Sequence, residues 1–245
     1  MEIMQHYTYL NAITRSDPDW TLYTPYQLGM VGYFSLHFIW LKLLLPWRFF
    51  RLWALADGVD PPENMVRCMT DNYSATAFWR GWHRSVNKWI VRYVYIPLGG
   101  SGSVGAEKQG LLRRLANMLV VFTFVAIWHD VSLRLLTWGW LVVLFVLPEM
   151  GATVLVPRRR WAGSPVAYRF ICGFGAVVNM LMMAVANLVG FAIGVEGVKG
   201  WVRSMVGSWG GLAFMGTVVG AIFVDSQVMF ERREEERRLG LKVKC

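Results

Sequence analysis

Two long stretches without a charged side chain constrain the fold of this chain most. Residues 170–195 form a run of 26 uncharged residues, and residues 204–224 form a run of 21. A helix needs about 20 apolar residues to cross the hydrocarbon layer of a bilayer, so either run is long enough to span a membrane. Only 17% of the residues are charged, whereas a typical soluble domain has about a quarter. The sequence therefore predicts an all-α polytopic membrane protein.

Three further apolar runs are shorter or contain isolated ionisable residues. Charged residues at the ends of such runs can extend their side chains toward water, which allows the helices to be longer than the uncharged runs. We therefore expect about five transmembrane helices within a single membrane domain over residues 1–245. The three additional spans are 26–47, which contains His37 and Lys42, 115–128, extendable to Leu111, and 135–148, extendable to Val131.

Residues 51–110 are more polar and form a motif-rich region that we predict to be cytosolic or re-entrant. Within it, the pattern WIVRYVYIPLGG is amphipathic and ends near Pro97, which is too short to cross a bilayer. A re-entrant or interfacial helical segment is the best interpretation. The GSGSVG run at 100–105 follows no predicted strand, so we interpret it as a flexible turn and not as a nucleotide-binding loop.

Basic residues predict the orientation of the spans. Most lie in the loops 98–114 and 149–169 and in the segment 225–245, which share one side if the last four spans each cross once. The positive-inside rule then predicts a cytosolic C-terminal tail at 225–245, with ERREEERR as a solvated helix end. The net charge of +9 follows from this topology, so no nucleic-acid partner is predicted.

Two of the four histidines are candidates for chemistry. His83 lies in FWRGWHRSVNKW, and His129 ends the apolar run VFTFVAIWH before Asp130. A metal site needs three or four converging ligands, and only these two histidines and Asp130 are available, so none is predicted. An ionisable residue beside a membrane span suggests function, and imidazole is suited to general-base work. The alternative is that His129 is a structural histidine of the helix bundle.

The same residues resemble a known family. FWRGWHRSVNKWIVRYVYIPLGGS at 78–101, followed by AIWHD at 126–130, is similar to the paired motifs of the membrane-bound O-acyltransferase (MBOAT) superfamily. The flanking segments RFFRLWALADGVDPPENMVRC at 48–68 and VLPE at 146–149 resemble its glycerol uptake protein branch. That branch is associated with remodelling of the lipid of glycosylphosphatidylinositol (GPI) anchors, which implies a multi-pass protein of the endoplasmic reticulum membrane.

The resemblance implies roles for individual residues. His129 would be the general base, and His83 would orient or polarise a substrate. The co-substrate would be a long-chain acyl-CoA, with no other cofactor, and the acceptor would be the hydroxyl of a membrane lipid. His83, Trp82 and Asn87 are alternative donors to the oxyanion. The candidate substrate-binding residues are Trp79, Arg80, Trp82, Asn87, Trp128 and Asp130.

The members of this superfamily are considerably longer than 245 residues. The resemblance therefore implies that this chain is the C-terminal part of a longer protein with a partial MBOAT fold, whose N-terminal half is expected to be required. Two alternatives to acyl transfer remain open: a non-catalytic regulator, and a polyol transporter. A transporter would more naturally show repeated halves, and no internal repeat is evident in the sequence.

Overall fold

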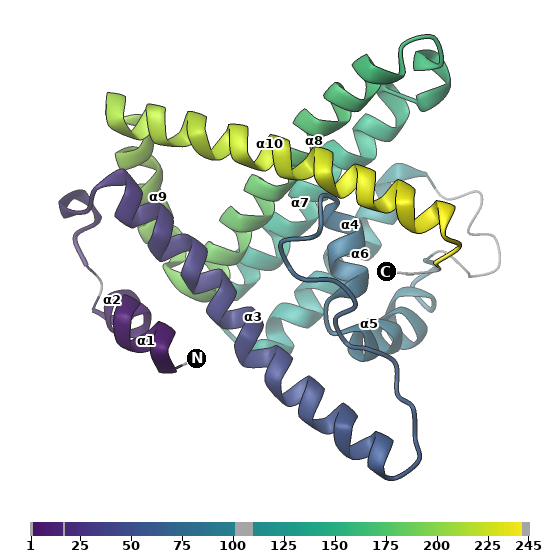
Figure 1. Cartoon of the computed structure of the whole chain (residues 1–245). Coiled ribbons are helices and arrows are strands. Elements are labelled where there is room, and N and C mark those ends of the chain that lie inside the picture. Colours follow the sequence, from purple (N-terminus) through teal and green to yellow (C-terminus); the bar gives the residue numbers. More distant parts are fainter. Residues whose placement is uncertain (1, 17, 101–109, 242–245) are drawn as a thin grey trace.

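The computed structural model describes residues 2–16, 18–100 and 110–241, and every regular element in these ranges is helical (Figure 1). This confirms the predicted all-α class. The longer helices are α3 (Pro25–Ala56), α6 (Leu111–His129), α7 (Leu133–Leu155), α8 (Pro165–Asn187), α9 (Gly194–Val206) and α10 (Trp209–Arg238). The short elements are α1 (Glu2–Thr8), α2 (Leu10–Arg15), η1 (Trp20–Leu22), α4 (Ala75–Gly81), α5 (Arg84–Ile90), η2 (Val91–Tyr95), η4 (Arg158–Trp161) and η5 (Leu188–Ala192).

Five of these helical segments are long and apolar enough to cross a membrane. They are α3, α6, α7, the combined α8 and η5, and α10. Each matches one of the five predicted spans, and α6 begins at Leu111, as the extended prediction allowed. Many large apolar side chains on their surfaces are exposed, among them Trp140 and Leu144 on α7 and Phe174 on α8. Such faces are expected where helices contact lipid, so the chain is a multi-pass membrane protein.

Polar side chains mark where the long helices begin. Thr24 forms a capping box with Gln27, and Pro25 occupies the first turn of α3. Ser132 and Ser208 accept backbone N–H groups at the starts of α7 and α10. These caps satisfy N–H groups that have no partner inside the helix, which is especially important near lipid.

Helix α3 continues past the predicted end at residue 47 as far as Ala56. Its last turns carry Arg48 and Arg51, which the following loop neutralises. Arg48 pairs with Glu63 at 3.1 Å, and Arg51 pairs with Asp60 at 3.0 Å. Because the loop folds back on the helix end, α3 can continue through Arg48 and Arg51 and both side chains still have acidic partners.

The helices α6, α7 and α8 form the centre of the fold. A Cβ on Gly139 of α7 would lie 2.8 Å from the carbonyl oxygen of Phe122 on α6, so these two backbones approach closely. Trp138 and Val142 on the same helix are almost fully buried. Figure 1 shows α10 crossing α8. Helix α3 diverges from α10, and α9 lies between the neighbouring ends of α3 and α10.

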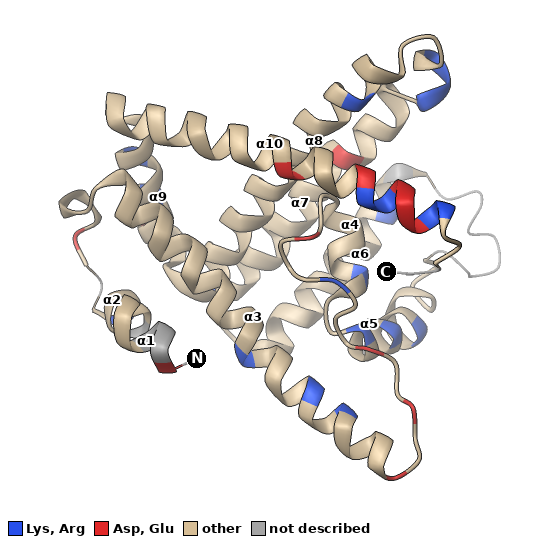
Figure 2. Cartoon of the chain, viewed as in Figure 1, with Lys and Arg blue, Asp and Glu red and all other residues tan. Residues whose placement is uncertain are grey.

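Charged residues gather at the far end of α10 (Figure 2), while Lys42 and Asp225 lie near the middle of α3 and α10. Arg67 forms a bidentate pair with Glu236 at 2.9 and 2.6 Å, and Arg233 pairs with Asp71 at 3.0 Å. The Arg67 side chain is only 8% exposed. Residues 225–238 were expected to belong to a tail, but they continue α10. The ERREEERR segment was expected to be a solvated helix end, but part of it packs on the loop 57–74.

The motif-rich region 51–110 contains the end of α3, a loop, and the short helices α4 and α5 with the π-turn η2. The amphipathic segment predicted to end near Pro97 is helical through Tyr95 and then turns. Trp89 on this segment stacks on Phe124 of α6, with 6.2 Å between the ring centroids. The segment therefore packs against the membrane span α6, and it is not itself one of the helices long enough to cross a membrane. Most of the GSGSVG run lies outside the described residues.

We predict that Gly190→Ala destabilises the fold, because a Cβ on Gly190 would lie 2.7–2.8 Å from the Trp138 side chain. Overpacking of this kind costs about 1–3 kcal/mol. Gly216→Ala on α10 is the matched control, since nothing lies within 4 Å of its Cβ, and alanine favours a helix by about 1 kcal/mol over glycine. Thermal unfolding in detergent should shift in opposite directions for the two variants. A stabilising effect of Gly190→Ala would contradict the close packing.

Candidate functional site

Helix α4 carries the tryptophan-rich motif, and its position depends on α7. Its first N–H groups lie against the carboxylate of Glu149, which accepts from the backbone nitrogen of Ala75 at 2.8 Å. Ser74 caps the same end by accepting from the nitrogen of Ala77 at 3.1 Å. The negative charge also suits the positive end of a helix. Glu149 is the last residue of the VLPE segment, so that segment anchors the motif.

His83 forms the sharp turn between α4 and α5. Its backbone is left-handed, with φ of 44°, a conformation that is costly for a residue with a Cβ and that often occurs at functional sites. Asn64, from the loop 57–74, stabilises the turn. Its carbonyl oxygen accepts from the Arg84 nitrogen at 3.0 Å, and its side-chain oxygen accepts from the Ser85 nitrogen at 2.9 Å.

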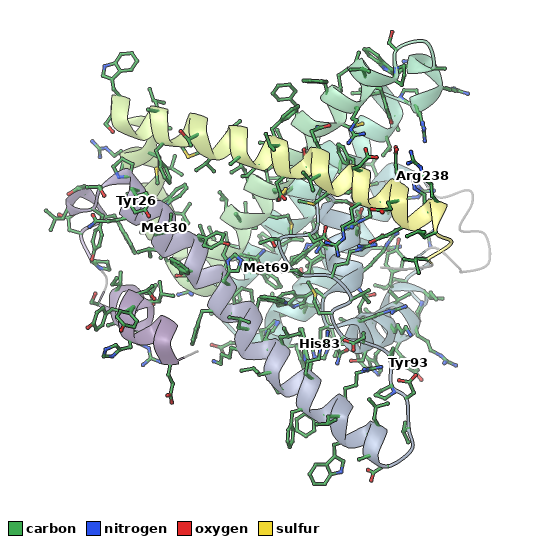
Figure 3. All side chains as sticks on the ribbon, in the orientation of Figure 1. Tyr26, Met30, Met69, His83, Tyr93 and Arg238 are labelled. Atoms are coloured by element: carbon green, nitrogen blue, oxygen red, sulfur yellow. The ribbon has the colours of Figure 1, made fainter. Side chains whose placement is uncertain are left out.

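The imidazole of His83, labelled in Figure 3, lies against the Trp47 ring of α3. Its ring centroid is 4.9 Å from that of Trp47 on α3, and the Trp82 ring is 5.7 Å from that of Trp47. Burial removes water from the imidazole and is the larger cause of a lowered His83 pKa. The positive charge of protonated His129 lowers the same pKa further. The two histidines are therefore close enough to interact electrostatically, and His83 favours its neutral form.

His129 is the last residue of α6, and its side chain stays accessible. Its ring contacts three aromatic rings, with centroid distances of 5.1 Å to Trp128, 5.9 Å to Trp138 and 5.5 Å to Phe191. Trp138 comes from α7 and Phe191 from the π-turn η5, so three parts of the bundle surround one imidazole. Asp130 follows at the C-cap with an exposed side chain.

Trp79 connects the motif helix to the His129 surroundings. Its ring is 5.6 Å from that of Trp138, which also contacts His129. The Asn87 side chain donates to the carbonyl oxygen of Trp79 at 3.2 Å and thereby fastens α5 to α4. The indole nitrogen of Trp79 is buried without a hydrogen-bond partner among the described residues. The Phe78 ring contacts Trp79 at 5.1 Å and Trp82 at 5.4 Å, so one chain of aromatic contacts runs from His83 to His129.

The predicted site residues do not all join this chain of aromatic contacts. His83, Trp79, Trp82 and Asn87 belong to the turn and its supports, and Trp128 lies against His129. Arg80 has an exposed side chain, and no hydrogen bond or ion pair within the described ranges links it to either histidine. Among these same residues, no three His, Cys, Asp or Glu side chains gather as metal ligands would.

Sequence reasoning missed the residues that bring the two motifs together. Trp47, Trp138 and Phe191 each contact one of the histidines but lie outside both paired motifs in the sequence. No local pattern separates them from other apolar residues of the spans. Glu149 carried a signal, because a carboxylate inside an apolar run needs a partner.

Beyond His83, three cations line one side of α5 and η2. Arg84, Lys88 and Arg92 are spaced four residues apart, which places them on one helical face, and Figure 2 shows this basic group on α5. None of the three forms an ion pair with an acidic residue that the structure describes. Like charges at this spacing repel, so an anion between them would be stabilised.

We predict that His83 makes the stability of the fold sensitive to mild acid. Its pKa lies below the ordinary value of 6.5 in the folded state, so the unfolded chain binds more protons as the pH falls through that range. Stability is therefore full above about pH 6.5 and decreases as the pH falls through the lowered pKa. Thermal unfolding at about pH 7.5 and about pH 5.5 should show a larger loss for the wild type than for His83→Asn. Equal losses would contradict the shift.

The chain matches a known protein family and several named relatives. A family model described as the membrane-bound O-acyltransferase family matches residues 1–194. The matched range contains both motif segments, 78–101 and 126–130, as well as Glu149. Both motif segments therefore lie within the part of the chain that the family model matches.

Named relatives match over most or all of the chain. It is 51% identical over 245 residues to membrane-bound O-acyltransferase GUP1 of Millerozyma farinosa, covering all of this chain and 46% of that protein. It is 49% identical to the protein of the same name in Saccharomyces cerevisiae, covering all of this chain and 41% of that protein. Protein-cysteine N-palmitoyltransferase HHAT of Mus musculus is 31% identical over 215 residues, which cover 85% of this chain and 42% of that protein.

The chain spans less than half the length of each of these three relatives. The family model nevertheless covers more than half of the chain, and all three relatives exceed 30% identity. On these matches, and on the histidine motifs that they contain, the chain belongs to the membrane-bound O-acyltransferase family.

Proposed function

We propose that this chain contributes the histidine pair of an O-acyltransferase that moves a long-chain acyl group from acyl-CoA to a lipid hydroxyl. The observation that carries the proposal is the chain of aromatic contacts that links His83 to His129, although the two histidines come from separate segments. The family membership and the names of the relatives support acyl transfer as the reaction class.

In the proposed reaction, His129 accepts the proton of the acceptor hydroxyl as the oxygen attacks the thioester carbonyl carbon. The resulting tetrahedral intermediate carries a negative oxygen that needs a hydrogen-bond donor. His83, Trp82 and Asn87 remain candidates for this donor. Collapse breaks the carbon–sulfur bond, the imidazolium returns its proton to the thiolate, and coenzyme A leaves. The aromatic rings that contact His129 hold its imidazole in one orientation toward the substrates.

The acceptor and the location rest on the family branch. The resemblance to the glycerol uptake protein branch supports lyso-GPI lipid as the acceptor and the endoplasmic reticulum membrane as the site. The excess of basic residues in the loops 98–114 and 149–169 and in 225–245 supports a cytosolic C-terminus. Since acyl-CoA is cytosolic, that orientation would place the row Arg84, Lys88 and Arg92 on the donor's side of the membrane.

We predict that His129→Ala lowers acyl transfer by about 10²- to 10⁴-fold, the range typical of a lost general base. Membranes that contain the 245-residue chain, or this chain fused to the N-terminal half of a relative, would be supplied with radiolabelled long-chain acyl-CoA. Label on lyso-GPI lipids that disappears with His129→Ala would support the enzyme and its acceptor. If neither protein transfers label at matched expression, the acyltransferase proposal fails, and a regulatory role becomes the better interpretation.

We also predict that the basic row binds the phosphates of the donor. Replacing Arg84, Lys88 and Arg92 together by Gln should raise the KM for acyl-CoA by about tenfold, or about 1.4 kcal/mol, and leave kcat nearly unchanged. The control is Gln at Arg158, Arg159 and Arg160, which removes the same charge from an exposed turn. An acyl-pantetheine donor lacks the nucleotide phosphates and should not distinguish the variant from the wild type. A rise in KM with both donors would contradict the prediction.

A further inference from the structure

We propose that Glu149 is a positioning residue that sets the place of His83 by fixing helix α4. This inference rests on the proposed function only for its effect on catalysis, because the effect on His83 itself can be measured without acyl transfer. Nothing in the family match or in the names of the relatives assigns a role to this carboxylate. The argument follows from its contacts.

The carboxylate of Glu149 is saturated by donors from the start of α4. Its two oxygens accept from the backbone nitrogens of Ala75 at 2.8 Å and Thr76 at 3.3 Å. They also accept from the hydroxyls of Ser74 and Thr76, both at 2.5 Å. Four donors on three consecutive residues converge on one side chain. Charge-assisted bonds of this kind are short and roughly twice as strong as neutral ones.

A third helix shares the junction. Asn179 on α8 is buried, and its side-chain nitrogen donates to Glu149 at 3.4 Å and to the carbonyl oxygen of Tyr73 at 3.3 Å. The start of α4 is therefore held against both α7 and α8. Because the charged group is half-buried among spans, removing it would leave the donors of α4 unsatisfied, which is costly in an environment with little water.

The other end of α4 carries the chemistry. The helix has only seven residues from Ala75 to Gly81, so it is about 10 Å long and too short to bend appreciably. Trp79 is on this helix and packs on Trp138, and His83 begins the turn that follows. A shift of the anchored end is therefore transmitted to the imidazole. Glu149 therefore acts on His83 through α4.

The test compares Glu149→Ala, Glu149→Gln and Glu149→Asp in the full 245-residue chain. Gln keeps the length and one acceptor oxygen, whereas Asp keeps the charge but is one methylene shorter. The readout is the rate at which diethyl pyrocarbonate modifies His83, mapped by mass spectrometry and divided by the rate at exposed His6. Glu196→Ala is the matched control, because that glutamate is 84% exposed and its ion-pair partner in the described part of the chain is the nearby Lys199.

We expect Glu149→Ala to raise the relative modification rate of His83 at least fivefold, Glu149→Gln to return it to within about twofold of the wild type, and Glu149→Asp to lie between them. In the transfer assay, kcat should follow the same order while the KM for acyl-CoA stays nearly constant. If the wild type transfers no label, the modification rates still decide the positioning role. If Glu149→Ala and Glu149→Gln both match Glu196→Ala in the rate at His83, the proposal is overturned.

The double variant Ser74→Ala with Thr76→Val covers the case in which Glu149→Ala does not fold. It keeps the carboxylate and removes the two hydroxyl donors. The rate at His83 should rise in the same direction but by less than in Glu149→Ala, because the two backbone bonds remain. An unchanged rate in a folded double variant would overturn the proposal as well.

Discussion

The contact between Glu149 and the start of α4 is the interaction on which the rest of the candidate site depends. The loop 57–74 has to end against membrane spans, where unpaired N–H groups are costly. One carboxylate satisfies the donors of three residues there and also binds Asn179 on α8. The start of the tryptophan-rich motif helix is thereby fixed to the bundle, and the His83 turn follows at the other end of this short helix.

Aromatic packing provides the second connection. Trp138 lies between Trp79 of the motif helix and His129 at the end of α6, and Phe191 completes the contact from η5. Rings in edge-to-face contact are rigid and apolar, so they hold the imidazole in place while its side chain stays accessible. Small residues make room for them, since Gly190 accepts the Trp138 ring where a Cβ would collide with it.

The charged residues serve two different purposes. At the end of α10, Arg67, Arg233, Asp71 and Glu236 form a mixed network that binds the loop 57–74 to the last helix. On α5 and η2 the cations stand in a row without acidic partners among the described residues. The first arrangement is neutral overall and suits a structural junction. The second produces a positive face beside His83 and suits an anionic group of a substrate.

The positions of the membrane spans and the choice of candidate catalytic residues followed from the sequence alone. Uncharged runs of sufficient length can exist in lipid only as helices, because the backbone must satisfy its own hydrogen bonds. The scarcity of histidines likewise left few candidates, and His83 and His129 were the two with a suggestive context. The ends of helices were less predictable, as α3 shows, because its last turns depend on ion pairs with a later loop.

Only the tertiary structure decided how those residues meet. Three contacts join separate segments of the chain. Asn64 stabilises the left-handed turn at His83, Trp138 lies between the two motifs, and Glu149 caps α4. The ERREEERR segment was expected to be solvated, and its partners Arg67 and Asp71 lie more than 150 residues away. A local pattern records which side chains are apolar or charged. It does not record which of them will be neighbours, because that depends on how the helices pack together.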